Sequence, residues 1–461
     1  MFRNTRHIHL VAIGGIGMSG IAEVLLNLGF AVSGSDLRRT PTTDRLASLG
    51  ARIWIGHDAG QIAGADVVVR STAVTETNCE IQAARQQRIP VIRRAEMLAE
   101  LMRLKEGVAI AGSHGKTTTT SLTAAVLAAG GLDPTVIVGG QVRALGTNAV
   151  LGGGRYLVAE ADESDGSFLH LVPTIAVVTN VDLEHVDHYP DLESLHAAFV
   201  AFLARVPFYG TAVLCLDDPQ TRRLALALDR RVVGYGLAPE AAVRVDPQSL
   251  RSGPDGQSAV VLAGDQPLGE LHLPQPGLHN LRNALAAVAV GLELGVDFAT
   301  AAAALAGFGG VARRCESHGE HGGVLVLDDY GHHPTELTAT LEVARAHARR
   351  VAVLFQPHRY SRTGHFAREF AEALAAADVI GLLPVYAAGE TDPGDAGSDR
   401  IAAHLAQHFG KTAAVLAGAE AVPAWLDGAL RPGDLLLTAG AGDIGRLVPT
   451  ICAHLAGAPR S

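Results

Sequence analysis

Apolar runs of strand length alternate with helix-length segments along the whole chain. A strand, a helix and a second strand in succession form a parallel connection, so this alternation predicts α/β architecture. We expect three domains, at residues 1–105, 106–310 and 311–461, because 461 residues with 48% hydrophobic content can fill that many cores. Between residues 240 and 275 the pattern shifts to short polar and apolar alternation, which predicts a small antiparallel patch.

The stretch AIAGSHGKTTTT, residues 109–120, has the character of a phosphate-binding loop. The usual pattern GxxxxGK[ST] has glycine where this chain has Ile110, so the match is not strict. The context is nevertheless that of such a loop, since a buried strand precedes it and a helix ending in glycine follows it. We expect its backbone N–H groups to bind phosphate oxygens, Lys116 to reach the outer phosphates and Thr117 to bind magnesium.

Polar side chains follow the next two predicted strands. Glu160 ends RYLVAE, and His185 and His188 come just after TIAVVTN. Because the carboxyl ends of parallel strands share one edge of a sheet, these groups predict a site for Mg²⁺ or Mn²⁺ near the phosphate loop. Glu163 and Asp165 are alternative ligands in the acidic stretch that follows Glu160.

A second glycine cluster lies near the N-terminus, where Gly15, Gly17 and Gly20 follow a predicted strand and Asp36 lies 21 residues after Gly15. This is the dinucleotide fingerprint of NAD enzymes, so a dehydrogenase is one interpretation. The same geometry binds any pyrophosphate, including that of a nucleotide sugar. A triphosphate loop in the same chain favours ATP-driven chemistry on a nucleotide-linked substrate, and a module that binds ATP without turnover is a third possibility.

Composition excludes several classes of function. The net charge of -10, without a long basic block, argues against a nucleic-acid partner. No apolar run approaches 18 residues, so we expect no membrane span and a cytoplasmic protein. The four cysteines lack paired spacing, which predicts neither a disulfide framework nor a zinc site.

Ten motifs, in order, resemble those of the Mur ligases of peptidoglycan synthesis: GGIGMSGIAEVL, IRRAEMLAELMR, GSHGKTTTT, EADESD, VDHY, PFYG, GLHNLRNALAA, DDYGHHPTE, FQPHRYSRT and AGAGDIG. The resemblance implies a Rossmann-like first domain that binds a UDP-sugar and a central domain like that of P-loop ATPases. It also implies a Rossmann-like third domain that binds an amino acid and closes on ATP. DDYGHHPTE and QPHRYSRT are characteristic of the alanine-adding member and of a ligase that recycles murein tripeptide.

The implied activity is joining L-alanine to the lactyl carboxylate of UDP-N-acetylmuramate through an acyl phosphate, with ATP and Mg²⁺, in cell-wall synthesis. The tripeptide-recycling ligase is the nearest alternative and an NAD-dependent dehydrogenase a more distant one. The resemblance also implies small-molecule partners alone and a monomer or weak homodimer.

The resemblance assigns roles to residues of this chain. For the ATP site it implies Gly112, Ser113, His114, Gly115, Lys116, Thr117, Thr118, Asn280, Asn283 and Asp329. For the UDP-sugar site it implies Gly14, Gly15, Gly17, Ser19, Asp36 and Ser71. For the acceptor and the amino acid it implies Tyr330, His332, His333, His358 and Arg359.

The metal ligands implied by the resemblance are Thr117, Glu160 and His185. Charge on the transferred phosphate would be met by Lys116 together with Arg313 or Arg314. A base must also take a proton from the attacking amine, and His185, His188 and His333 are all candidates.

Overall fold

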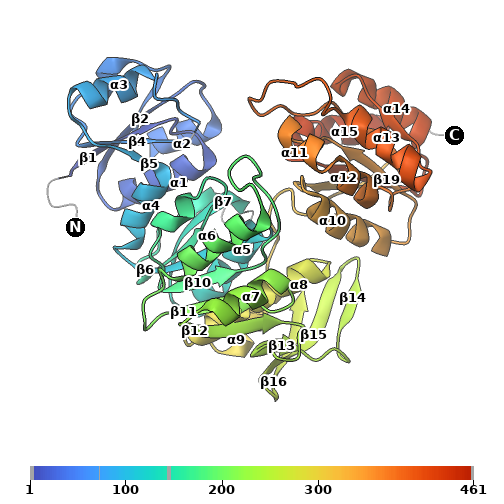
Figure 1. The fold of residues 1–461 in the computed structure, drawn as a ribbon, viewed down its shortest axis with the longest axis horizontal. Coiled ribbons are helices and arrows are strands. Elements are labelled where there is room, and N and C mark those ends of the chain that lie inside the picture. The colour runs from blue at the N-terminus through green and yellow to red at the C-terminus, as the bar shows by residue number, and fades with distance from the viewer. Residues whose placement is uncertain (1–4, 72, 143–146, 458–461) are drawn as a thin grey trace.

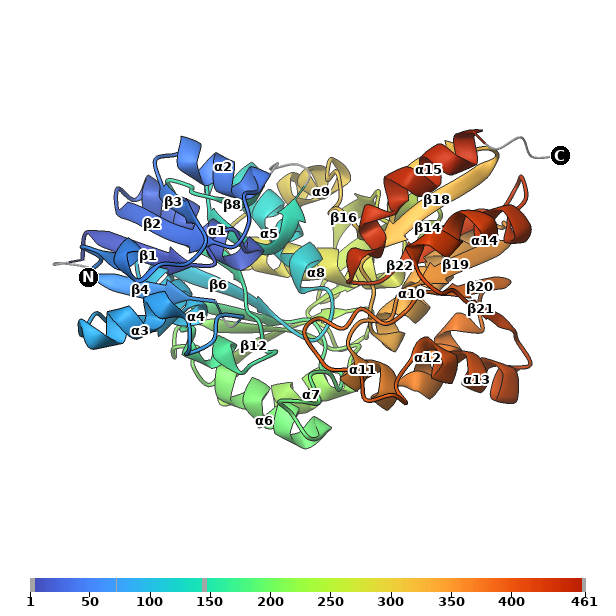
Figure 2. The ribbon, with the colours of Figure 1, turned by 90° about the horizontal axis from the view of Figure 1, so that it is seen from above.

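The computed structural model describes residues 5–71, 73–142 and 147–457, which form three α/β domains in sequence order (Figure 1). Each domain has its own sheet, and in Figure 1 the first and third domains both lie above the central one, at the left and at the right. Figure 2 shows the same two outer domains from above, again at opposite ends of the molecule. The predicted α/β class with three domains is confirmed. The boundaries after residues 105 and 310 fall between the sheets and remain a proposal.

The first domain is a five-stranded parallel sheet in the order β3-β2-β1-β4-β5. Its strands are β1 His7–Val11, β2 Ala31–Asp36, β3 Arg52–Ile55, β4 Val67–Arg70 and β5 Val91–Arg93. Its helices are α1 Ile16–Asn27, α2 Pro41–Ser48, the 3-10 turn η1 Ala59–Ile62, α3 Cys79–Gln86 and α4 Arg94–Met102. The strand order reverses on the two sides of β1, and the glycine cluster follows the carboxyl end of this strand, the position where sheets of this kind bind ligands.

The central sheet has 11 strands in the order β14-β15-β13-β12-β11-β10-β6-β9-β7-β8, with β16 paired to β15. The strands around the phosphate loop are β6 Glu106–Ala111, β7 Thr135–Val142, β8 Thr147–Val150, β9 Tyr156–Glu160, β10 Ile175–Val178, β11 Thr211–Cys215 and β12 Arg231–Gly236. The other strands are β13 Val243–Val245, β14 Arg251–Gly253, β15 Gly256–Ala263 and β16 Gln266–Leu273. β13, β14 and β16 all pair antiparallel with β15, which confirms the predicted patch.

Helices cover the central sheet: α5 Lys116–Ala129, η2 Ser167–His170, α6 Leu192–Leu203, α7 Pro219–Ala227, α8 Leu278–Glu293 and α9 Phe298–Ala306. Strands β10 and β11 are buried along their whole length, as expected for parallel strands with helices on both faces. In the parallel register Ile110 of β6 lies opposite Glu160 of β9, and Ala111 lies opposite Val178 of β10. The segments that follow these three strands therefore meet at one edge of the sheet.

The third sheet runs β17-β18-β22-β19-β20-β21 and is parallel except for β17. Its strands are β17 Glu316–His321, β18 Val324–Asp329, β19 Val351–Phe355, β20 Val379–Leu382, β21 Ala413–Val415 and β22 Leu435–Ala439. Its helices are α10 Pro334–Ala346, α11 Tyr360–His365, α12 Ala367–Leu374, α13 Ser398–Phe409, η3 Ala419–Ala421, α14 Val422–Ala429, η4 Asp443–Arg446 and α15 Val448–Gly457. Across the described residues, no helix combines the length and apolarity that a membrane span requires.

Candidate active site

The phosphate loop lies between β6 and α5, as the sequence predicted. Gly112 and Gly115 have φ angles of 127° and 82°, in the region that favours glycine. A side chain at Gly112 would collide with Thr179 Oγ1, and one at Gly115 would come within 2.6 Å of Asn283 Oδ1. Both glycines are therefore required by close neighbours as well as by backbone conformation.

Lys116 is the first residue of α5, and its ammonium group lies over the loop. Its Nζ donates to the carbonyls of Gly112 and Ser113 at 2.7 and 3.0 Å and pairs with Glu163 Oε1 at 2.8 Å. Burial alone would lower the pKa of Lys116, but the charge of Glu163 and of other nearby carboxylates raises it overall. The lysine therefore carries a full positive charge at neutral pH, as a phosphate-binding group must.

The predicted magnesium ligands lie beside this lysine in two groups. Thr117 Oγ1 donates to Glu160 Oε2 at 3.0 Å. His185 Nε2 lies 3.5 Å from Glu163 Oε1 and 3.9 Å from Glu184 Oε2. Among the described residues the buried Glu163 Oε2 has no hydrogen-bond partner, which is costly for a carboxylate oxygen. Several carboxylate oxygens and a hydroxyl, one oxygen lacking any partner, fit the ligand preference of Mg²⁺.

A cavity of about 370 Å³ lies beside the loop and is lined by both the central and the third domain. Six of the predicted ATP-site residues line it, namely His114, Gly115, Thr118, Asn280, Asn283 and Asp329. Arg314, which was predicted to meet the charge of the transferred phosphate, lines it as well. Sequence analysis missed other lining residues, among them Asp217 and Arg282, whose side chains pair at 2.6 Å. The volume is in the range of pockets that enclose small molecules.

Two polar groups in this wall are fixed by backbone contacts. Asn280 Nδ2 donates to the Pro276 carbonyl at 2.8 Å. Asp329, at the end of β18, accepts from the N–H groups of Cys315 and Gly331 at 2.7 and 2.6 Å. Burial raises the pKa of Asp329 above its usual value. Both side chains are thus held rigidly at the nucleotide-sized cavity.

The arginine pair that sequence analysis could not separate is resolved in space. Arg313 points into the third domain, where its Nε lies 2.9 Å from Asp328 Oδ2 and its Nη2 donates to the Gly440 carbonyl at 2.6 Å. Arg314 lines the cavity, with its Nη1 3.5 Å from Glu336 Oε1. Of the two, Arg314 is placed to meet a phosphate in the cavity.

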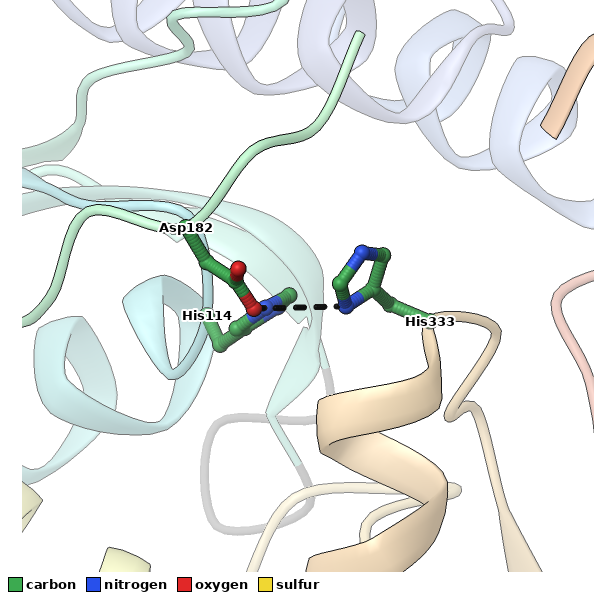
Figure 3. A group of neighbouring side chains, drawn as sticks. All are labelled: His114, Asp182 and His333. Carbon is green, nitrogen blue, oxygen red and sulfur yellow. Dashed lines mark hydrogen bonds and ion pairs between the residues drawn. The ribbon is translucent and has the colours of Figure 1, made fainter. Parts of the chain in front are cut away.

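The third domain contacts the phosphate loop directly (Figure 3). His114 Nε2 lies 3.0 Å from Asp182 Oδ2, and His333 Nδ1 lies 3.4 Å from the same oxygen. Thr335 Oγ1 donates to this oxygen at 2.6 Å. Burial would lower the pKa of His114, but Asp182 and Glu336 raise it to about 10. Burial and the neighbouring His114 lower the pKa of His333 to about 4, so His333 is neutral at pH 7.

The predicted acceptor residues gather around Glu184, which sequence analysis missed. Arg362 Nη2 lies 2.7 Å from Glu184 Oε1, and both side chains are buried. His332 Nε2 lies 3.4 Å from the same oxygen, and the rings of His332 and His358 are 5.8 Å apart. Burial and His332 lower the pKa of His358 to about 3. The paired charges of Glu184 and Arg362 thus join the central and third domains.

Two further predicted residues lie at the rim of this group. The ring of Tyr330 is 5.6 Å from that of His332, and Arg359 Nη1 lies 3.4 Å from Asp187 Oδ2 of the central domain. The RYSRT and DLEHVD stretches contain the charged residues that sequence analysis left unassigned, Arg362 and Glu184. Both are polar residues in segments that follow buried strands, and this position is the feature of the sequence that could have identified them.

The first domain holds the glycine cluster against Asp36. The Gly14 N–H donates to Asp36 Oδ2 at 2.8 Å, and a side chain at Gly17 would come within 2.7 Å of Arg94 Nη1. Arg94, also missed by sequence analysis, reaches Asp162 Oδ2 of the central domain at 3.3 Å. Gly15 caps α1 and Ser19 lies buried within that helix. Ser71 directly follows β4, so the set surrounds the carboxyl ends of β1, β2 and β4.

Comparison with known proteins agrees with this arrangement of domains. Residues 7–106 match the Mur ligase family catalytic domain, residues 110–291 the Mur ligase middle domain, and residues 313–442 the Mur ligase glutamate ligase domain. The chain belongs to the Mur ligase family. It is 52% identical over 449 residues to UDP-N-acetylmuramate--L-alanine ligase of Desulfosudis oleivorans, covering 97% of this chain and 98% of that one.

Solved structures of this family have the same fold. The UDP-N-acetylmuramate-alanine ligase of Thermotoga maritima superposes with a TM-score of 0.79 at 31% identity, covering 97% of this chain and 99% of that one. A murein peptide ligase of Psychrobacter arcticus superposes with a TM-score of 0.72 at 23% identity, covering 99% and 100% of the two chains. The second likeness is informative about the fold alone.

Proposed function

We propose that this protein joins L-alanine to the lactyl carboxylate of UDP-N-acetylmuramate and converts ATP to ADP and phosphate. The observation that carries the proposal is the phosphate loop that holds the charged Lys116. His114, Gly115 and Thr118 of this region line a cavity that residues of the central and third domains form together. The 52% identical relative with the alanine-ligase name favours this reaction over tripeptide recycling and over NAD-dependent redox chemistry.

ATP would lie in that cavity, with its phosphates against residues 112–118 and its nucleoside between Asn280, Asn283 and Asp329. The magnesium site would be formed by Thr117, Glu160 and His185. Glu163 would be a further ligand, because its buried Oε2 has no hydrogen-bond partner among the described residues. When bound, Mg²⁺ would neutralise phosphate charge and orient the phosphate oxygens.

The first step transfers the γ-phosphoryl group. A lactyl carboxylate oxygen attacks the γ-phosphorus, the bond to the β-phosphate oxygen breaks, and ADP leaves with that electron pair. Such a transfer depends on in-line positioning and on charge neutralisation. Lys116, whose ammonium group lies against the phosphate loop, and Arg314, which lines the cavity from the third domain, would supply positive charge.

The second step forms the amide. The neutral amine of L-alanine attacks the acyl carbon, and phosphate leaves from the tetrahedral intermediate. The amine proton needs an acceptor, and we propose that one of His185, His188 and His333 takes it.

Substrate positions follow from the domains. The pyrophosphate of the UDP-sugar would bind Gly14, Gly15 and Gly17 at the N-terminus of α1, with Asp36, Ser19 and Ser71 around it. L-alanine would bind near Tyr330, His332, His358 and Arg359 of the third domain. Docking of the three domains would exclude water from the acyl phosphate.

Phosphate release by purified protein with ATP and Mg²⁺ tests the proposal. We expect release that requires both UDP-N-acetylmuramate and L-alanine. We further propose that the protein is a monomer or weak homodimer and works in the cytoplasm. Release only with L-alanyl-γ-D-glutamyl-meso-diaminopimelate would assign tripeptide recycling instead. A change in nicotinamide absorbance without ATP consumption would support the dehydrogenase, and ATP binding without release would leave a binding module.

A further inference from the structure

Three metal-ligating side chains meet at the contact between the central and third domains, apart from the proposed magnesium ligands. His114 belongs to the phosphate loop, Asp182 lies in the segment after β10, and His333 is the residue that caps the N-terminus of α10 (Figure 3). One oxygen, Asp182 Oδ2, lies 3.0 Å from His114 Nε2 and 3.4 Å from His333 Nδ1. Ligands bound at 2.0–2.2 Å in a tetrahedral site are separated by about 3.3 Å, so these spacings suit a shared ion.

His333 lacks the hydrogen bonds that a buried imidazole needs. Its side chain is 3% exposed, and neither ring nitrogen has a hydrogen-bond partner among the described residues. The ring faces Asp182 and His114 in Figure 3. Buried polar atoms are normally satisfied, and a buried nitrogen without a partner costs free energy. A ligand held between these three side chains would remove that cost for one of the two nitrogens.

The carboxylate of Asp182 is already oriented for binding. The backbone of Asp182 is fixed by Ser113: the Asp182 N–H donates to Ser113 Oγ at 2.9 Å, and Ser113 Oγ donates to the Asp182 carbonyl at 2.9 Å. Thr335 Oγ1 donates to Asp182 Oδ2 at 2.6 Å from the third domain. Such outer contacts position ligating side chains in metal sites.

We propose that His114 Nε2, Asp182 Oδ2 and His333 Nδ1 bind a divalent transition-metal ion of the zinc class. Two imidazole nitrogens and one carboxylate oxygen suit Zn²⁺ or Co²⁺ and do not suit Mg²⁺, which prefers oxygen ligands. The ion takes the place of the proton that His114 Nε2 shares with Asp182, and that proton is released to solvent.

Charge around the site is compatible with this exchange. The carboxylates of Glu184 and Glu336 lie 4.0 and 3.5 Å from His114 Nδ1. Exchange of one proton for a divalent ion adds one positive charge beside them. The ion would connect the phosphate loop to the first turn of α10 and would therefore hold the third domain against the central domain.

Titration of the full-length protein with Co²⁺, without nucleotide or substrate, tests this site. A Cys79→Ser background removes the exposed thiol as a competing ligand. We expect one site per chain with the visible absorption of low-coordinate Co²⁺, displaced by Zn²⁺. His333→Ala should weaken binding at least tenfold. His272→Ala, which changes an exposed histidine of β16, should leave binding unchanged.

Two further variants keep the result decisive. His114→Asn should weaken binding as His333→Ala does, and circular dichroism would show that each variant is folded. His185→Ala alters the proposed magnesium ligands and should leave the Co²⁺ spectrum in place. Unchanged binding in both His114→Asn and His333→Ala, or loss of the spectrum in His185→Ala alone, would overturn the assignment. Because no substrate is present, this outcome is independent of the proposed ligase activity.

Discussion

Replacing Lys116 by methionine separates the proposed catalytic role of this lysine from its contribution to stability. The substitution keeps an unbranched side chain of similar length but removes the charge that pairs with Glu163 at 2.8 Å. The side chains of the pair are 14% and 1% exposed, so Glu163 would be left as a buried carboxylate without its main partner.

The structure sets the size of both effects. Breaking a buried ion pair by removing one partner costs about 3–5 kcal/mol, so we expect the free energy of unfolding to fall by about 3 kcal/mol. Loss of a group that stabilises transferred phosphate should lower kcat by about 10²–10³. The double variant Lys116→Met/Glu163→Gln should recover most of the stability and none of the turnover.

Rapid-quench assays of ADP formation report the effect on turnover, and urea unfolding reports the effect on stability. Calorimetry measures the binding of UDP-N-acetylmuramate. Binding should persist, because the glycine cluster that would hold the UDP-sugar belongs to another domain. Lys411→Met is the matched control, since Lys411 Nζ donates to the Ala377 carbonyl within the third domain. ADP formation by Lys116→Met within tenfold of the parent rate, or its restoration in the double variant, would refute the reasoning.

Three other predictions follow from the same geometry. Arg314→Met should lower kcat/KM about 10²-fold with little loss of stability, whereas Arg313→Met should mainly lower the melting temperature of the third domain; equal kinetic defects would contradict this division. Gly115→Ala should weaken ATP binding at least tenfold in a fluorescence titration, about 1.4 kcal/mol, because its φ is 82° and the new carbon would lie 2.6 Å from Asn283 Oδ1. The pKa of His114 is raised from 6.5 to about 10, so its stabilising contribution is complete below pH 6.5 and is lost as pH rises through 10. The free energy of unfolding, measured in urea, should therefore fall more steeply from pH 7 to 10 in the parent than in His114→Asn, and parallel curves would show that the contribution is absent.

Features that depend on local sequence were predicted well. The phosphate loop was expected between a strand and a helix, and β6 and α5 flank it. Glu160 was expected beside Thr117 because polar residues at the ends of parallel strands share an edge, and their side chains lie 3.0 Å apart. In both cases a few neighbouring residues and one rule of sheet geometry determine the position.

Features that depend on domain docking were not predicted. Glu184 and Arg362 are 178 residues apart, and nothing in either stretch indicates the other as its partner. Arg313 and Arg314 are adjacent and chemically identical, so only the backbone could separate them. The φ angle of 58° at Arg313 turns the chain at that point, and the two side chains lie on different sides of it.

Both outer domains reach the central domain through segments that follow its active-edge strands. Arg94 of the first domain contacts Asp162 after β9, within the stretch that also provides Glu163. Thr335 of the third domain contacts Asp182 after β10, the residue that binds His114 of the phosphate loop. A shift of either outer domain therefore acts on a side chain next to the phosphate site, without needing a path through the sheet. Under the proposed function, this arrangement would let substrates held by separate domains control phosphoryl transfer in the central one.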